Sequence, residues 1–257
     1  MAQLSDDCFA FGGPMMSVDE AVGLIAARVT RVEETETVAL AEADGRILAQ
    51  DVVAPLPLPP FTNSAVDGYA VASRDLPKGE AESFPVRGRV QAGATPGSAI
   101  ESRQAVRIFT GAPMPAGADT VYMQEDVRLE GDRVVLPAGL KPGANVRPAG
   151  EDIPFGHAAL KAGQRLRPQD VALIAAFGLT QVDVRRRIRV AVFSTGNELV
   201  SPGDVRAAPQ LFDSNRFMLM AMLRRLGCEA DDLGIFSDEP KALAEALTRV
   251  AGRHDLL

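Results

Sequence analysis

The sequence has no tryptophan, and its 257 residues include only two cysteines, two histidines and 5% aromatic residues. Cys8 and Cys228 are too few for a disulfide framework, so we expect a reducing compartment such as the cytoplasm. The same scarcity leaves no zinc-type cluster, so any bound metal ion would need oxygen ligands. A platform of aromatic rings for stacking nucleic-acid bases is also excluded.

Positive charge and long apolar runs are scarce as well. The 34 acidic and 27 basic residues give a net charge of −7, whereas a nucleic-acid-binding protein usually presents a basic face. The longest purely apolar run, residues 171–177, is too short to span a bilayer. Residues 1–7 show no basic segment followed by an apolar core, so no secretory signal is expected. We therefore expect a soluble, cytoplasmic protein without nucleic-acid or membrane partners.

The composition that is present, 46% hydrophobic and 24% charged residues, is typical of a globular protein. A Ser-x-x-Glu capping box at residues 17–20, followed by apolar residues at helical spacing, predicts a first helix. A short strand is predicted over residues 35–40 and a second short helix over residues 41–50. Between residues 53 and 146, short β-prone runs separated by glycine and proline turns predict a small β domain.

From about residue 168 the pattern changes. Pro168 suits a first helical position, and a strand is predicted over residues 181–184. The arginines at 185–187 are expected to form a solvated boundary face rather than a phosphate site. From residue 188 onward, apolar strands alternate with helices, which predicts a parallel α/β sheet. Residues 255–257 resemble the opening of a further strand, so we expect a fragment of a longer protein.

The most constrained stretch of the chain leads to an aspartate. Four prolines within residues 55–60 make an extended, stiff approach. Asn63 and Ser64 favour a turn, and Gly68 allows a left-handed or closely packed backbone. Asp67 therefore stands at a tight bend, where a carboxylate is held for chemistry. The alternative is an ordinary Asp-Gly turn that closes a hairpin.

Two further candidates lie in and after the β region. Thr110 follows a predicted strand and precedes a glycine and proline turn, so it either lines a site or merely ends the strand. Asp152, beside Glu151, lies in a segment that contains several glycines. A carboxylate in such a segment can approach a ligand or an ion, or it can simply be solvated.

Polar side chains also follow the predicted parallel strands, at the edge where open α/β sheets bind ligands. The hydroxyls of Ser194 and Thr195 suit an oxyanion or a phosphate, and the carboxylates of Glu198 and Asp238 suit a hydrated Mg²⁺. The alternative is structural: Ser194 and Thr195 end a strand, and Asp238 caps a helix.

Five blocks of sequence, taken together, are more specific than any one of them. They are Phe-Thr-Asn-Ser-Ala-Val-Asp-Gly-Tyr-Ala at 61–70, Arg-Ile-Phe-Thr-Gly-Ala-Pro at 107–113, Asn-Val-Arg at 145–147 with Gly-Glu-Asp-Ile at 150–153, Phe-Ser-Thr-Gly-Asn-Glu-Leu at 193–199 and Asp-Ser-Asn-Arg at 213–216. Over residues 17–257 the chain thereby resembles the molybdopterin molybdenumtransferase family, which includes bacterial MoeA and the gephyrin E domain. The order of the blocks favours functional roles over the separate structural alternatives.

The resemblance implies a mixed α/β, multidomain and elongated fold. A β-rich domain II, residues 53–146, would be inserted in a discontinuous α+β domain I, residues 17–52 and 147–186. A partial three-layer, molybdopterin-binding α/β domain III, residues 187–257, would follow. The resemblance also implies a homodimer in which the acid-bearing loop of one subunit faces the α/β domain of the other.

The activity implied by the resemblance is insertion of molybdate into adenylylated molybdopterin, with Mg²⁺ and release of AMP. Other proteins of molybdenum cofactor biosynthesis are possible partners. The residues assigned to catalysis by the resemblance are Asp67, Thr110, Asp152, Glu198 and Asp238, of which Asp67, Asp152 and Glu198 would also bind the metal ion. The residues assigned to substrate binding are Asn63, Ser64, Ser194, Thr195, Gly196 and Asn215.

The chain departs from the family pattern at two positions, since Thr62 and Asn197 stand where aspartate is common. The glycine-rich pterin turn and the C-terminal β domain of the family would follow residue 257, so part of the pterin site is expected outside this chain. Two alternatives remain, a molybdopterin adenylyltransferase and a non-enzymatic scaffold of the gephyrin type. The long β domain and the Asp67 loop argue against the adenylyltransferase.

Overall fold

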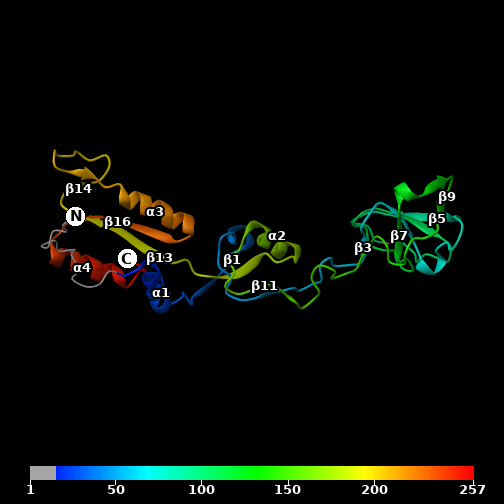
Figure 1. The fold of residues 1–257 in the computed structure, drawn as a ribbon, viewed down its shortest axis with the longest axis horizontal. Coiled ribbons are helices and arrows are strands. Elements are labelled where there is room, and N and C mark those ends of the chain that lie inside the picture. The colour runs from blue at the N-terminus through cyan, green and yellow to red at the C-terminus, as the bar shows by residue number, and fades with distance from the viewer. Residues whose placement is uncertain (1–15, 96) are drawn as a thin grey trace. The chain divides into compact units, whose positions relative to one another are not determined.

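The computed structural model describes residues 16–95 and 97–257 and shows a mixed α/β protein, as expected (Figure 1). The chain divides into two compact units. Unit 1 contains the residues up to Glu36 together with Arg185–Leu257, and unit 2 is Thr37–Val184. The division into domains I, II and III with the boundaries given above stays a prediction.

The largest sheet of unit 2 has six strands in the order β7-β4-β6-β5-β9-β8. All pairs are antiparallel except β5 with β6. The β-prone runs predicted within residues 53–146 are confirmed. The strands are β4 (Gly68–Val71), β5 (Glu82–Val90), β6 (Ala105–Ile108), β7 (Thr120–Met123), β8 (Arg128–Glu130) and β9 (Arg133–Leu136), with short 3-10 turns η2 (Ser73–Asp75) and η3 (Gln124–Asp126).

Two hydrophobic clusters stabilise this sheet, one on each face. Ile108 and Val121 are fully buried in one cluster. Phe84, Tyr122 and Leu136 are buried in the other, where the Tyr122 hydroxyl donates to the carbonyl of Pro137 at 2.8 Å. Burial of both faces makes the sheet a rigid support for the loops at its edges.

The rest of unit 2 is built from short strand pairs and one helix around a separate core that includes Leu48, Leu166 and Ile174. The strand pairs are β1 (Thr35–Ala39) with β12 (Gln181–Arg185), β2 (Val52–Val53) with β11 (Ala158–Leu160), and β3 (Asn63–Ser64) with β10 (Val146–Arg147). Helix α2 (Pro168–Ala176) begins at a proline, as predicted.

The helix predicted over residues 41–50 is wrong. Only one 3-10 turn forms there, η1 (Leu40–Glu42). The backbone N–H of Gly45 donates to the carbonyl of Leu166 at 2.8 Å, and that of Leu48 donates to the carbonyl of Gln164 at 2.9 Å. Residues 164–166 therefore provide the hydrogen bonds that a helix would have made internally.

Unit 1 is built on the parallel pair of β13 (Arg189–Thr195) and β16 (Glu229–Phe236). Helix α3 (Asn215–Leu226) packs on this pair (Figure 1), and Met220 is buried against Val190 and Val192. Helix α4 (Pro240–Ala251) follows β16, and the short pair of β14 (Leu199–Val200) and β15 (Leu211–Phe212) lies between β13 and α3 in the sequence. Leu256 bridges Val190 in parallel, which agrees with the strand opening expected at residues 255–257.

The predicted first helix is confirmed as α1 (Val18–Arg28), with the capping box between Ser17 and Glu20. None of its residues is buried, and Val18, Val22 and Ile25 are all more than half exposed. Among the described residues, no helix is both long and apolar enough to cross a bilayer.

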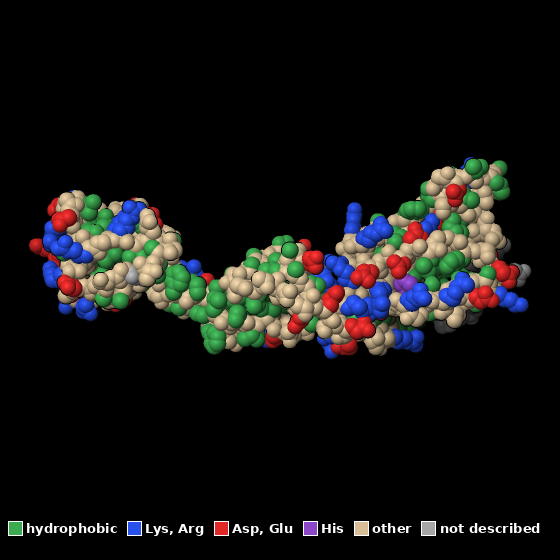
Figure 2. All heavy atoms as spheres, turned by 180° about the vertical axis from the view of Figure 1, so that it is seen from behind, with side chains coloured by type: hydrophobic (Ala, Val, Ile, Leu, Met, Phe, Trp, Pro, Cys, Tyr) green, Lys and Arg blue, Asp and Glu red, His purple; other side chains and the backbone are tan. Residues whose placement is uncertain are grey.

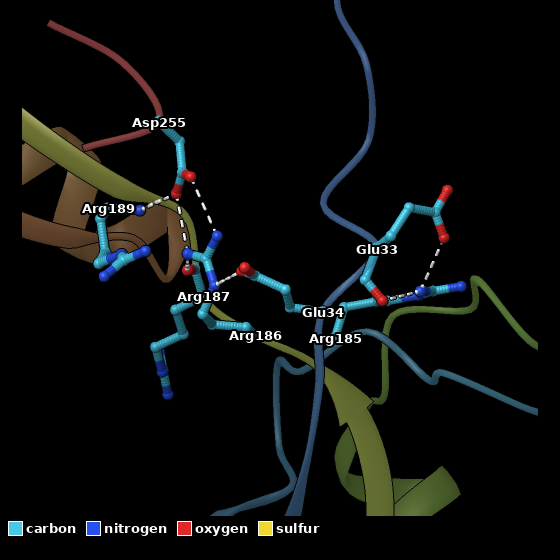
Figure 3. A network of polar contacts seen from close by, with 7 residues as sticks. All are labelled: Glu33, Glu34, Arg185, Arg186, Arg187, Arg189 and Asp255. Atoms are coloured by element: carbon cyan, nitrogen blue, oxygen red, sulfur yellow. Dashed lines mark hydrogen bonds and ion pairs between the residues drawn. The ribbon is translucent and has the colours of Figure 1, made fainter. Parts of the chain in front are cut away.

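The arginines at residues 185–187 were expected to form a solvated boundary face, and the second segment of unit 1 does begin at Arg185. The solvated part of this prediction is wrong, because these arginines are half-buried and bind partners distant in sequence (Figure 3). Arg185 binds Glu33, and Arg186 binds both Glu34 and Asp255, the latter at 2.8 and 3.0 Å. Asp255 also accepts the N–H of Arg189 at 2.7 Å.

On the face drawn in Figure 2, Lys and Arg side chains lie interspersed with Asp and Glu over unit 1, at the right of the view.

Candidate functional site

The loop before β4 holds Asp67 against Thr110. One carboxylate oxygen of Asp67, Oδ1, accepts both the backbone N–H and the hydroxyl of Thr110, each at 2.8 Å. These two donors, chiefly the N–H, lower the pKa of Asp67, and the charge of Arg107 acts in the same direction. The side chain is therefore an anion at neutral pH, and its second oxygen makes no hydrogen bond to any described residue.

The hairpin alternative for the Asp67 loop is wrong. The strand that follows, β4, pairs with β6 and β7, and the strand that precedes it, β3, pairs with β10. Gly68 is needed because a Cβ atom there would stand 1.8 Å from the carbonyl oxygen of Tyr122. Close packing on β7, rather than a turn, explains this glycine.

Asn63 and Ser64 are buried and bind their own loop. The amide of Asn63 donates to the carbonyl of Phe61 at 3.0 Å, and the hydroxyl of Ser64 donates to the carbonyl of Val66 at 2.6 Å. Both side chains thus fix the approach to Asp67. Their role in substrate binding stays a prediction.

Asp152 is held by an arginine of β10. The Arg147 guanidinium reaches both carboxylate oxygens of Asp152 at 2.7 Å and binds Glu151 at 2.7 Å. Arg147 lies opposite Asn63 in the β3–β10 pair, so this acidic segment adjoins the segment that leads to Asp67. The Asp152 side chain is 57% exposed and remains open to a ligand.

In unit 1, a pocket of about 320 Å³ lies at the carboxyl end of β13. Its lining residues are Ser194, Thr195, Leu199, Leu211, Phe212, Asp213, Ser214 and Asn215. The structure therefore brings together three of the residues assigned to substrate binding, Ser194, Thr195 and Asn215. The first backbone N–H groups of α3 lie at the same place, where a helix favours an anion.

Gly196 follows the pocket residues and does not line the pocket. Its φ is +138°, and a Cβ atom there would stand 2.6 Å from a carboxylate oxygen of Glu198. A side chain at residue 196 would displace Glu198, so the glycine sets the position of that carboxylate. Asp238 accepts the backbone N–H of Asn197 at 3.1 Å, and therefore lies beside the same loop.

The structural alternative for Asp238 is wrong, because it does not cap a helix. The N-cap residue of α4 is Glu239, and no side-chain capping bond is made there. Asp238 and Glu198 are both exposed. Two acids thus flank the residues that follow β13, at the edge where the sheet was expected to bind a ligand.

Two family models match this chain. Residues 16–178 match the MoeA N-terminal region (domain I and II), and residues 191–257 match a probable molybdopterin binding domain. The chain belongs to the MoeA family.

Named relatives agree with this family. The chain is 37% identical to the molybdopterin molybdenumtransferase of Haemophilus influenzae over 244 residues, covering 95% of this chain and 60% of the relative. It is 40% identical to that of Nostoc sp. over 250 residues, covering 95% and 57%. The solved moeA protein of Pyrococcus horikoshii OT3 is 32% identical, with a TM-score of 0.86 over 93% of this chain and 64% of that one. The chain spans 57–60% of the length of the first two relatives.

Sequence reasoning missed the buried ion network beneath the pocket of this MoeA-family chain. Arg216, 4% exposed, binds Asp213 at 2.8 Å and forms a second ion pair with Asp232 of β16. Burial opposes ionisation of Asp213, but hydrogen bonds from Arg216 and Ser194 outweigh it and lower its pKa. The network therefore positions Ser194 in the pocket. Its signals in the sequence were the i,i+3 spacing of Asp213 and Arg216 and their place in the block at residues 213–216.

The metal ligands predicted from the resemblance belong to both units: Asp67 and Asp152 to unit 2, and Glu198 to unit 1. Among the described residues, no three His, Cys, Asp or Glu side chains gather closely enough to hold a metal ion. The donor chemistry nevertheless suits Mg²⁺, which prefers carboxylate oxygens, because Asp67 keeps one oxygen unbonded and Glu198 is exposed. The metal site stays a prediction.

Proposed function

We propose that this chain is part of a molybdopterin molybdenumtransferase, which inserts molybdate into adenylylated molybdopterin and releases AMP. The names of the relatives support this function. The observation that carries it is the pocket at the carboxyl end of β13, within the region that matches a molybdopterin binding domain. Hydroxyls, an amide and a helix N-terminus converge there, as recognition of a phosphate-bearing ligand requires.

In this proposal the pocket binds the adenylylated cofactor. Ser194 and Thr195 donate hydroxyl hydrogen bonds, Asn215 adds an amide, and the backbone at Gly196 approaches the ligand. Asn63 and Ser64 shape the loop that presents Asp67. These roles are consistent with the exposure of Thr195 and Asn215 and with the burial of Asn63 and Ser64.

The acids would act on the phosphate bond. Asp67, Asp152 and Glu198 would hold Mg²⁺, which supplies charge neutralisation at the leaving phosphate when it is bound. Thr110 keeps Asp67 ionised and oriented, and Asp238 holds the backbone of the loop that carries Glu198. Molybdate is the second substrate.

We further propose that the protein acts as a homodimer in the cytoplasm, together with other proteins of molybdenum cofactor biosynthesis and without nucleic acid. The acid-bearing loop of one subunit would face the α/β domain of the other. Support comes from α1, where Val18, Val22, Ile25 and the following Val29 expose 59–79% of their surface. An apolar helix face of this kind is suited to a protein interface.

The experiment that tests the function measures AMP release by the family-length protein from adenylylated molybdopterin. We expect AMP release that requires both molybdate and Mg²⁺. No AMP release under these conditions would contradict the proposal. ATP-dependent formation of adenylylated molybdopterin would instead identify an adenylyltransferase. Binding of the cofactor without any turnover would identify a scaffold.

A further inference from the structure

One face of the large sheet in unit 2 carries two arginines side by side. The pairing of β5 with β6 sets Arg89 opposite Arg107, and the pairing of β6 with β4 sets Arg107 opposite Tyr69. Like charges directly opposite each other on neighbouring strands are destabilising. The sheet therefore keeps an unfavourable pair at this position.

Aromatic rings hold both arginines in place. The guanidinium carbon of Arg89 lies 4.6 Å from the centre of the Phe109 ring, and that of Arg107 lies 4.8 Å from the same centre. Arg107 also lies 5.0 Å from the centre of the Tyr69 ring. Stacking on a ring fixes the plane of a guanidinium and leaves N–H groups at its edge free to bind an oxyanion.

Neither arginine forms an ion pair with a described carboxylate. Arg107 donates to the carbonyl of Gly68 at 3.3 Å and to the side-chain oxygen of Gln124, both uncharged. By contrast Arg103, which lies over the ring of Phe84 in the same sheet, is paired with Glu82. Stacking on a ring therefore does not by itself exclude a carboxylate partner in this sheet.

The pair adjoins the proposed catalytic loop, and Arg89 is open to solvent. Thr110, which binds Asp67, directly follows Phe109. Arg89 is exposed, and it lines a pocket of about 470 Å³ that does not include Arg107 or Phe109. A small ligand can therefore reach Arg89 from solvent.

We propose that Arg89 and Arg107, held over Phe109, form a binding site for a tetrahedral oxyanion next to Asp67 and Thr110. The identity of the oxyanion rests on the proposed function, which offers two sources: molybdate itself and the phosphate of the adenylylated cofactor. Planar guanidinium groups bind such ions with paired, charge-assisted hydrogen bonds. The pair also offsets the repulsion that Asp67 exerts on an incoming anion.

The test measures binding without turnover, by calorimetric titration of the chain with molybdate and, separately, with AMP. Arg89→Gln and Arg107→Gln are each expected to lower the affinity for one of the two ligands at least about tenfold. The double variant is expected to abolish the binding of that ligand. Loss of molybdate binding alone identifies molybdate, and loss of AMP binding alone identifies the phosphate. Arg103→Gln, the stacked arginine that already has a carboxylate partner, is the matched control and should change neither.

Arg107→Lys is a control for a folding defect, because it keeps the positive charge but loses the planar pair of N–H donors. We expect this variant to melt like the wild type and to bind at least about fivefold more weakly. Equal binding of both ligands by the wild type and the folded double variant would overturn the site, even if AMP release proceeds normally. Failure of AMP release in a protein that still shows the arginine-dependent binding would overturn the proposed function and leave the site intact.

Discussion

The loop of Asp67 and the pocket beside α3 are held in place in different ways. Asp67 lies in the loop that leads into a sheet with a hydrophobic cluster on each face, and its position depends on backbone pairing and on two hydrogen bonds from Thr110. The pocket lies over a core with three buried residues, Val190, Val192 and Met220, and depends on the buried charges of Arg216 and its partners. Substitution of a charge should therefore impair chemistry in the first region and folding in the second.

The largest effect is expected from Asp67→Asn, which removes the charge but keeps an oxygen that can accept from Thr110. We expect turnover to fall by about 10³-fold or more, because the carboxylate is positioned for a metal ion rather than for packing. The free energy of unfolding should change by less than about 0.5 kcal/mol. Rates of AMP release and urea unfolding of the same samples check both. Asp132→Asn, at an exposed acid of the same sheet domain, should leave the rate unchanged, and an active Asp67→Asn enzyme would contradict the expectation.

The next largest effect is expected from Asp213→Ala, which should lower the stability of the fold. Removing one partner of a buried ion pair leaves Arg216 partly uncompensated, although Asp232 remains. We expect unit 1 to lose about 3 kcal/mol of unfolding free energy, at the lower end for buried pairs. Urea unfolding measures the loss, with Asp204→Ala at an exposed position as the control. Equal stability of the two variants would show that the pocket does not depend on this network.

Contacts that are local in the sequence and contacts that are distant also differ in how well the fold could be predicted from the sequence. The strands of the large sheet follow from β-prone runs and turns that lie next to each other in the sequence. The helix expected over residues 41–50 failed because Gly45 and Leu48 bond to residues more than 110 positions away. The arginines at 185–187 were misread for the same reason, since Glu33 and Glu34 precede them by about 150 residues.

The candidate site was harder to predict from the sequence than the fold. Asp67 and Thr110 are 43 residues apart, and only the family resemblance grouped them before their contact was known. Asp213 and Arg216 are close in sequence, but Asp232, which completes the network, comes from β16. Spacing along one element could identify single candidates, whereas the partners that hold them come from neighbouring strands.

A smaller effect is expected where charges are partly exposed. The side chains of Arg186 and Asp255 are 21% and 27% exposed, so Asp255→Asn should destabilise unit 1 by only about 1 kcal/mol. The difference in stability between the wild type and Asp255→Asn should disappear in about 1 M NaCl, because salt screens the ion pair. Thermal melting at low and high salt measures the difference. Arg31→Gln, in a pair that is 80% and 63% exposed, should have no measurable effect; a larger loss there than at Asp255 would contradict the ranking.

The smallest effect concerns pH, and again belongs to unit 1. Both ring nitrogens of His254 face acceptors, the carbonyl of Val250 at 3.0 Å and Asp231 at 2.9 Å, and these bonds raise its pKa despite burial and the nearby charge of Arg189. The stabilisation is therefore complete below the unfolded pKa of about 6.5 and is lost as pH rises through the higher folded value. We expect the melting temperature to fall between about pH 6 and 8, corresponding to a loss of less than about 1 kcal/mol in the free energy of unfolding. His254→Gln should remove this dependence, and a melting temperature that rises over the same interval would contradict the assignment.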